Sequence, residues 1–381
     1  MRMEARHIRA VHKSSMAVVW LSLAYFLSGL AAGPEHRAAF HISMMAAGML
    51  GAFVVAVESS YIVSTLRAKS HPLMPAALAG LVAAPPIAAA AAPLGALAGP
   101  GPAAAAIAAA LALEAVAAIV AAGLTRGSVR LSMAASAYAS LAGAAYSALA
   151  AGVEPLVVAG LGFLAAYPLQ MIYAVSIHAF PSTYSRRPIA PLAPAPFALA
   201  TLAAALIAVE PGEWRAAALL AGLSTLAYLP AARVHEAPRI WGEVASSRRP
   251  PIVVKTHKYF LEGHVFVAII AAFTVALALL ALEGAPITPG CIAHALAIGF
   301  AGLHIMIHAP MMLPVILNIP TARRYTPLPY ALLALAPPSL CIDKRLAAPL
   351  VLLAVASGAL IVWPPRGQTT GGARASRPAA P

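Results

Sequence analysis

The sequence predicts an all-α polytopic membrane protein of about 12 transmembrane helices. Of its 381 residues, 61% are hydrophobic and 10% are charged, and the mean hydropathy is +0.84. Apolar segments follow one another along nearly the whole chain, and the basic residues gather in alternate connections between them. This composition excludes a soluble enzyme with a single membrane anchor.

Twelve apolar segments are separated by proline, glycine or charged residues. A helix rises about 1.5 Å per residue, so about 20 residues cross a hydrocarbon core roughly 30 Å thick. The eleventh segment is short and contains Pro337 and Pro338, so the count falls to eleven if it does not span. The segments run from about 15 to 33, 41 to 63, 73 to 96, 103 to 124, 131 to 151, 156 to 178, 190 to 208, 214 to 231, 260 to 282, 291 to 317, 327 to 341 and 347 to 363.

The segments and the connections between them form one domain, residues 1–364. The basic start MRMEARHIRAVHK runs directly into the first segment, which predicts a cytoplasmic tail and not a cleaved signal peptide. Residues 365–381 are rich in Pro, Gly, Arg and Ala and are expected to be a disordered cytoplasmic tail. Cys291 and Cys341 match no zinc spacing, and they form a disulfide only if the fold brings them together.

The distribution of charge predicts the orientation. With the N-terminus inside, 21 of the 25 basic residues lie on the inner side, and only Arg37, Arg215, Lys344 and Arg345 lie outside. This asymmetry places both termini in the cytoplasm. The net charge of +13 is therefore a topology signal, so the predicted partner is the lipid bilayer and not nucleic acid. The expected location is the plasma membrane of a prokaryotic cell.

A pattern recurs where segments two, six and ten end. A hydroxyl residue, a basic pair or near pair, and prolines follow one another in STLRAKSHPLMP, STYSRRPIAPLAP and TARRYTPLPY. Because these connections are four segments apart, the sequence predicts three repeats of four helices.

Segment ten carries three histidines and no formal charge. An imidazole inside hydrocarbon needs a hydrogen-bond partner or a metal. His304 and His308 share one face of a helix, whereas His294 lies about 15 Å away along the axis. One metal ion cannot bind all three, so this segment carries polar groups at two depths.

The topology places other histidines at the same two depths. His41 lies at the outer end of segment two, level with His294, and this pair suits the axial ligation of a haem. The alternative is that both rings are wetted by headgroup water. His178 and His264 lie in the inner half with His304 and His308, where imidazoles could bind copper or a second haem. Solvated helix ends or a buried polar network are the alternatives there.

Glu58 and Glu114 are acids within apolar segments. An ionised carboxylate is costly there, so each is protonated, paired or in a wet cavity. The functional interpretation is a proton or ion pathway, and the alternative is local hydrogen bonding. Candidate partners lie on segments five and six: Ser136, Tyr138, Ser140, Tyr146, Ser147, Tyr167, Gln170 and Tyr173.

Two motifs resemble a known family. HISMMAAGM, from His41 to Met49, and HALAIGF, from His294 to Phe300, are similar to motifs of the NnrS family of haem- and copper-containing membrane proteins linked to nitric oxide metabolism. Twelve helices in three groups of four also resemble the architecture of haem-copper oxidase subunit I. The resemblance implies that His41 and His294 ligate a haem, of b type. It also implies copper as a second cofactor, nitric oxide as a small gas ligand, and a membrane redox partner.

The chain also departs from these families. Segment seven contains no histidine, so terminal oxidase or nitric oxide reductase activity is not expected, and Ser43 stands where the NnrS pattern has a second histidine. The predicted function is haem binding, with copper as a further candidate ligand, in nitric oxide response or membrane electron transfer. Such a protein is not expected to be a classical enzyme. The alternatives are a secondary transporter with buried acids at the midplane and a structural membrane subunit.

Overall fold

The computed structural model describes residues 2–32, 38–66, 71–184, 186–247, 251–317 and 325–362. The structure is 88% helix, and no strand occurs in these described ranges. The predicted all-α class is therefore confirmed. The predicted tail of residues 365–381 lies outside the described residues.

Each of the twelve predicted segments is helical. Segments two, six and ten are each divided into shorter helices, and the others are formed by one helix each. In chain order the helices are α1 (Arg2–Ala32), α2 (Ala38–Ile42), η1 (Ser43–Ala52), α3 (Phe53–Leu66), α4 (Met74–Ala98), α5 (Pro100–Leu124), α6 (Gly127–Leu149), α7 (Leu156–Ala166), α8 (Pro168–Thr183), α9 (Ala195–Val209), η2 (Pro211–Glu213), α10 (Trp214–Ala231), η3 (Val234–Glu236), α11 (Ala237–Ala245), α12 (Pro251–Leu282), α13 (Pro289–His294), η4 (Ala295–Ala301), α14 (Gly302–Leu317), α15 (Leu328–Ile342) and α16 (Lys344–Val362).

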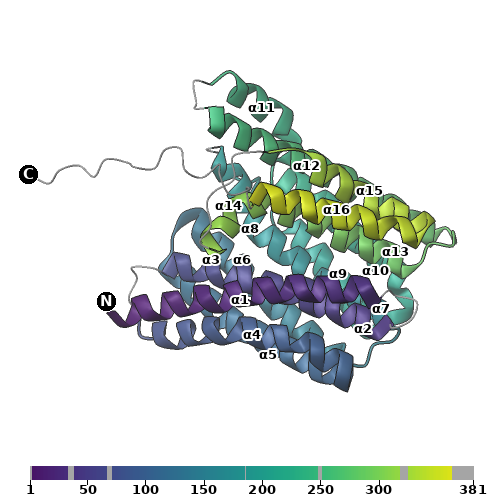
Figure 1. The fold of residues 1–381 in the computed structure, drawn as a ribbon, viewed down its shortest axis with the longest axis horizontal. Helices are drawn as coiled ribbons and strands as arrows, with labels where there is room; N and C mark the ends of the chain where they lie inside the picture. The colour runs from purple at the N-terminus through teal and green to yellow at the C-terminus, as the bar shows by residue number, and fades with distance from the viewer. Residues whose placement is uncertain are drawn as a thin grey trace, which may run out of the picture.

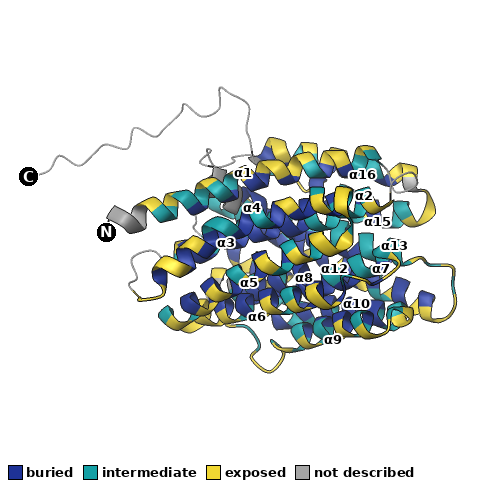
Figure 2. Cartoon of the chain, turned by 90° about the horizontal axis from the view of Figure 1, so that it is seen from below, coloured by how far each residue is buried: buried dark blue, intermediate teal, exposed yellow. Residues whose placement is uncertain are grey.

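Length and composition identify a membrane protein. Among the described residues, seven helices can cross a bilayer, or eight if the bent pair Pro211–Ala231 and Val234–Ala245 forms one span. Three further apolar helices are shorter, so the count of 12 crossings stays a prediction. The outward faces are apolar, and side chains such as Val116, Leu202 and Ile269 are more than half exposed. Such faces suit contact with lipid, and Figure 2 shows the buried residues gathered inside the bundle.

Segments two, six and ten meet at the centre of the bundle. There α2 and η1 contact α7, α13 also contacts α7, and α14 contacts α3. Each of the three segments is irregular. The π-helix η1 begins two residues after His41, and the π-helix η4 begins directly after His294. In segment six the helix is interrupted at Tyr167, which has φ −130° and ψ −68°. After these irregularities the chain continues as α3, α8 and α14, of 14, 16 and 16 residues.

One end of the bundle carries an ion-pair cluster. In Figure 1, α1 begins and α16 ends on the left, and α11 also lies toward that side. Arg186, in the connection from α8 to α9, pairs with Glu236 and with Glu243, and Arg233 also pairs with Glu236. These pairs tie the connection between α8 and α9 to the segment after α10.

Candidate functional site

His41 and His294 face each other near the other end of the bundle. Their ring centroids are 6.1 Å apart and the ring planes differ by 28°. The Nδ1 atom of His41 is 2.9 Å from the carbonyl oxygen of Gly29, and that of His294 is 2.6 Å from the carbonyl oxygen of Gly290. Because a carbonyl only accepts, Nδ1 must carry the proton in both neutral rings. Each Nε2 therefore keeps its lone pair.

An apolar cavity surrounds this pair of rings. Its volume is about 160 Å³, and it is lined by residues from α1, η1, α7 and the helices of segments ten to twelve. Phe26, Met45, Met49 and Leu164 are among its apolar walls. His41 is 8% exposed, so the site is largely shielded from the surroundings of the bundle.

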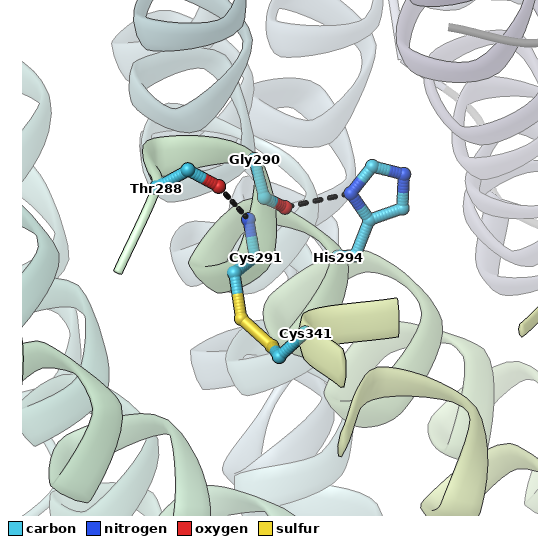
Figure 3. Close-up of a disulfide and its surroundings, with 5 residues drawn as sticks. All are labelled: Thr288, Gly290, Cys291, His294 and Cys341. Carbon is cyan, nitrogen blue, oxygen red and sulfur yellow. Dashed lines mark hydrogen bonds between the residues drawn. A yellow bond between two sulfur atoms is a disulfide. The ribbon is translucent and has the colours of Figure 1, made fainter. Parts of the chain in front are cut away.

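A disulfide fixes the short helix that carries His294. The hydroxyl oxygen of Thr288 accepts a hydrogen bond from the Cys291 amide, and Pro289 occupies the first turn of α13. Cys291 is bonded to Cys341 at the end of α15, with the two Cα atoms 5.5 Å apart. In Figure 3 the disulfide and the imidazole of His294 leave α13 in different directions. The bond therefore anchors the helix while the ring points toward the cavity that it lines.

Three other histidines gather toward the opposite end of the bundle. His264 of α12 lies 5.9 Å from His304 and 6.4 Å from His308, and the last two are 6.5 Å apart, measured between ring centroids. The Nδ1 atoms of His264 and His304 donate to the carbonyl oxygens four residues earlier. The Nε2 atom of His304 accepts from the Tyr228 hydroxyl at 3.1 Å.

The inner group does not form a closed metal site. Within the described ranges, no three His, Cys, Asp or Glu residues are grouped so that they could hold one metal ion. Phe180, two residues after His178, contacts His264, with the ring centroids 4.5 Å apart. The hydrogen-bond partner of the His304 Nε2 atom is Tyr228, a residue that the sequence did not indicate. It lies on segment eight, and nothing in the local sequence ties it to segment ten.

The two buried acids have different surroundings. Glu114 is fully buried, and its Oε2 accepts hydrogen bonds from the Tyr167 hydroxyl at 2.8 Å and from the Ser140 hydroxyl at 3.0 Å. Glu58 is 2% exposed and lines a second cavity, of about 80 Å³, together with His304 and His308. The acids therefore belong to two places, a hydroxyl-lined interior and the wall of a cavity.

Comparison of the chain with protein-family models, with curated proteins and with solved structures finds no match in any of the three. The geometry of the site is therefore the basis for inferring function.

Proposed function

We propose that the protein binds one haem between His41 and His294 and transfers single electrons within the membrane. A metal–imidazole bond is about 2 Å long, and a ring centre lies about 1 Å from its nitrogen, so two imidazoles on opposite sides of one iron place their centres about 6 Å apart. The 6.1 Å separation of these rings suits one iron. This separation, across an apolar cavity, carries the proposal.

The chain's own groups suit electron transfer. When bound, a haem supplies a reversible one-electron couple. The carbonyls of Gly29 and Gly290 fix the tautomer of the two rings, so that Nε2 is the ligating atom and its basicity is raised. The apolar walls exclude water from the ligands. His41 and His294 would hold the haem from both sides, which suits electron transfer. The absence of a C-x-x-C-H motif from the sequence favours a b-type haem held without covalent attachment.

We infer that the chain crosses the membrane 12 times with both termini in the cytoplasm. All twelve segments are helical, and α1 begins at the end of the bundle where α16 stops. The Cys291–Cys341 disulfide lies where the positive-inside rule places the outer side. Disulfides persist in oxidising compartments outside the cytoplasm, so the bond supports this orientation. The irregular positions in segments two, six and ten support three repeats of four helices.

Copper at the inner group is not part of the proposal. Three imidazoles bound to one ion by bonds of about 2 Å would place their ring centres about 5 Å apart. The three rings stand between 5.9 and 6.5 Å apart, and Tyr228 occupies one Nε2. A role in nitric oxide response derives from the NnrS-like motifs alone. Binding of nitric oxide to the iron would require one of the two axial imidazoles to leave.

The absorption spectrum of the purified protein tests the haem proposal. We expect a low-spin haem spectrum with one haem per chain. His41→Ala and His294→Ala should each lose the haem or convert it to high spin, whereas His235→Ala, in the exposed connection after α10, should leave the spectrum unchanged. Unchanged haem content and Soret band in both ligand variants would refute the assignment.

A secondary transporter is the second candidate, and Glu114 favours it. Its partner Tyr167 lies at the break between α7 and α8, and buried acids beside interrupted helices are typical of transporter binding sites. A purified protein that lacks haem, together with cation-coupled uptake in liposomes that Glu114→Gln abolishes, would favour this function over electron transfer.

A further inference from the structure

The cavity that Glu58 lines lies between α3, α8 and α14, which Figure 1 shows beside one another. Most of its lining is apolar, including Phe53, Val57 and Val175. Its polar lining consists of Glu58, Ser176, His304 and His308. A ligand that fills this space must therefore be mainly apolar and carry polar groups toward the carboxylate and the imidazoles.

One atom in each of two of these polar groups lacks a partner. The Oε1 atom of Glu58 and the Nε2 atom of His308 are buried and have no hydrogen-bond partner in the described parts of the chain. Buried polar atoms are seldom left unpaired, because an unmade hydrogen bond costs about 1–3 kcal/mol. A ligand with two hydroxyl groups could donate one hydrogen bond to each.

The cavity is also a neighbour of the haem cavity. Ile305 lines both of them, so a ligand beside His308 would be separated from the haem cavity by a single side chain. A molecule that exchanges electrons would therefore be placed for direct transfer to the proposed haem.

We propose that this inner cavity binds a membrane hydroquinone and that its oxidation reduces the haem. This inference rests on the proposed function for its electron acceptor. Oxidation breaks the two O–H bonds of the hydroquinone and converts both C–O bonds to carbonyls, releasing two electrons and two protons. Each of the two electrons would be accepted by one ferric haem, in two protein molecules, so one hydroquinone serves two chains. One proton goes to the Glu58 carboxylate and the other to the imidazole of His308.

The first experiment measures binding without reference to haem. Protein in nanodiscs is titrated with decylubiquinone by calorimetry, with empty nanodiscs as the baseline. We expect saturable binding to the wild-type protein, and loss of binding in Val175→Trp, which fills the cavity. Absence of saturable binding to the wild-type protein would overturn the proposal. Binding by a protein that contains no haem would refute the proposed function and leave the quinone site standing.

The second experiment measures reduction. Under anaerobic conditions, decylubiquinol should reduce the ferric haem of the wild-type protein with half an equivalent of quinol per haem. Glu58→Gln and His308→Gln are close in size to the native residues and should slow reduction about 100-fold, the loss expected for a general base. Glu114→Gln, outside the cavity, should reduce at the wild-type rate, and dithionite should reduce every variant fully. Wild-type rates in Glu58→Gln, His308→Gln and Val175→Trp would show that electrons enter elsewhere.

Discussion

Glu114 shows how a single acid is accommodated inside the bundle. One carboxylate oxygen accepts two hydroxyl hydrogen bonds, from Tyr167 and Ser140, and both of these residues were among the partners that the sequence predicted. They lie on segments five and six, the segments richest in tyrosine and serine near this acid. The structure therefore selects two partners from a set of eight candidates.

Replacement of Glu114 tests the worth of these bonds. Glu114→Ala removes the acceptor and leaves two hydroxyls unpaired, so the free energy of unfolding should fall by about 1–3 kcal/mol. Glu114→Gln keeps an oxygen acceptor and should lose less. Chemical unfolding in detergent measures both changes. Equal stability of the alanine variant and the wild-type protein would mean that the two bonds contribute nothing.

Glu236 is an acid outside the apolar segments, and its surroundings are cationic. Burial raises the pKa of Glu236, but the hydrogen bond and charge of Arg233 and the charges of Arg186 and His235 outweigh this effect, so the pKa is lowered from its usual 4.5. A carboxyl group whose pKa is lowered by folding stabilises the folded state above its unfolded pKa. That contribution is lost as the pH falls through the folded value.

Glu236→Gln should therefore lower the free energy of unfolding at neutral pH by about 1 kcal/mol. The melting temperature should fall accordingly. The difference from the wild-type protein should be constant above about pH 5 and should shrink as the pH falls below 4.5. Melting curves recorded from about pH 3.5 to about pH 7 measure this difference. Glu243→Gln is the control, because that side chain is 53% exposed and should contribute less. A difference that grows on acidification would contradict the argument.

At the scale of the element, the central helices depend on glycine for close packing. A Cβ atom at Gly48, in η1, would lie 2.6 Å from a ring carbon of Tyr25 and 2.8 Å from Cβ of Ala92. At Gly299, in η4, it would lie 2.7 Å from a side-chain carbon of Ile270. These glycines therefore let each π-helix approach a neighbouring helix, and neither lines the cavity around His41 and His294.

Gly48→Ala should consequently destabilise the protein by about 1–3 kcal/mol, the usual cost of overpacking. Gly123→Ala is the matched control in α5, since a Cβ atom there meets nothing within 4 Å and alanine favours a helix over glycine by up to about 1 kcal/mol. Thermal unfolding of the two variants should give shifts of opposite sign. Equal shifts would show that the contact with Tyr25 is relaxed at no cost.

At the scale of the whole molecule, three irregular segments meet at the centre and the other helices surround them. The two cavities lie one after the other along segment ten, and Ile305 lines both of them. His41 and His294 line the first cavity, and His304 and His308 line the second. This arrangement places a candidate haem site toward the end with the disulfide and a candidate quinone site toward the end with the ion-pair cluster.

Reporter fusions test the orientation of the whole chain. Because the basic residues divide 21 to 4, fusions after Leu66, Arg187 and Arg324 should report the cytoplasm, and fusions at Gly99 and Glu283 the outside. An alkaline phosphatase and fluorescent protein pair distinguishes the two locations. Two or more reversed reports would overturn the model of 12 crossings.

The sequence by itself determined which stretches are helical and that they form a membrane protein. Hydropathy and segment length are local properties, and the cost of unpaired backbone groups in hydrocarbon leaves the helix as the structure for each stretch. Depth was also predicted from the sequence, because the alternation of basic connections is expected to order the residues along the membrane normal. His41 and His294 were assigned to one level in this way.

Only the tertiary structure decided which residues meet. The rotation of each helix about its axis and its distance from its neighbours depend on packing among all of them, and no local pattern encodes these quantities. For this reason Tyr228 as the partner of His304 and the joining of Cys291 to Cys341 emerged only from the fold. The same packing leaves Ile305 as the wall shared by two cavities, because a side chain's contacts are fixed by every helix around it and not by its own segment.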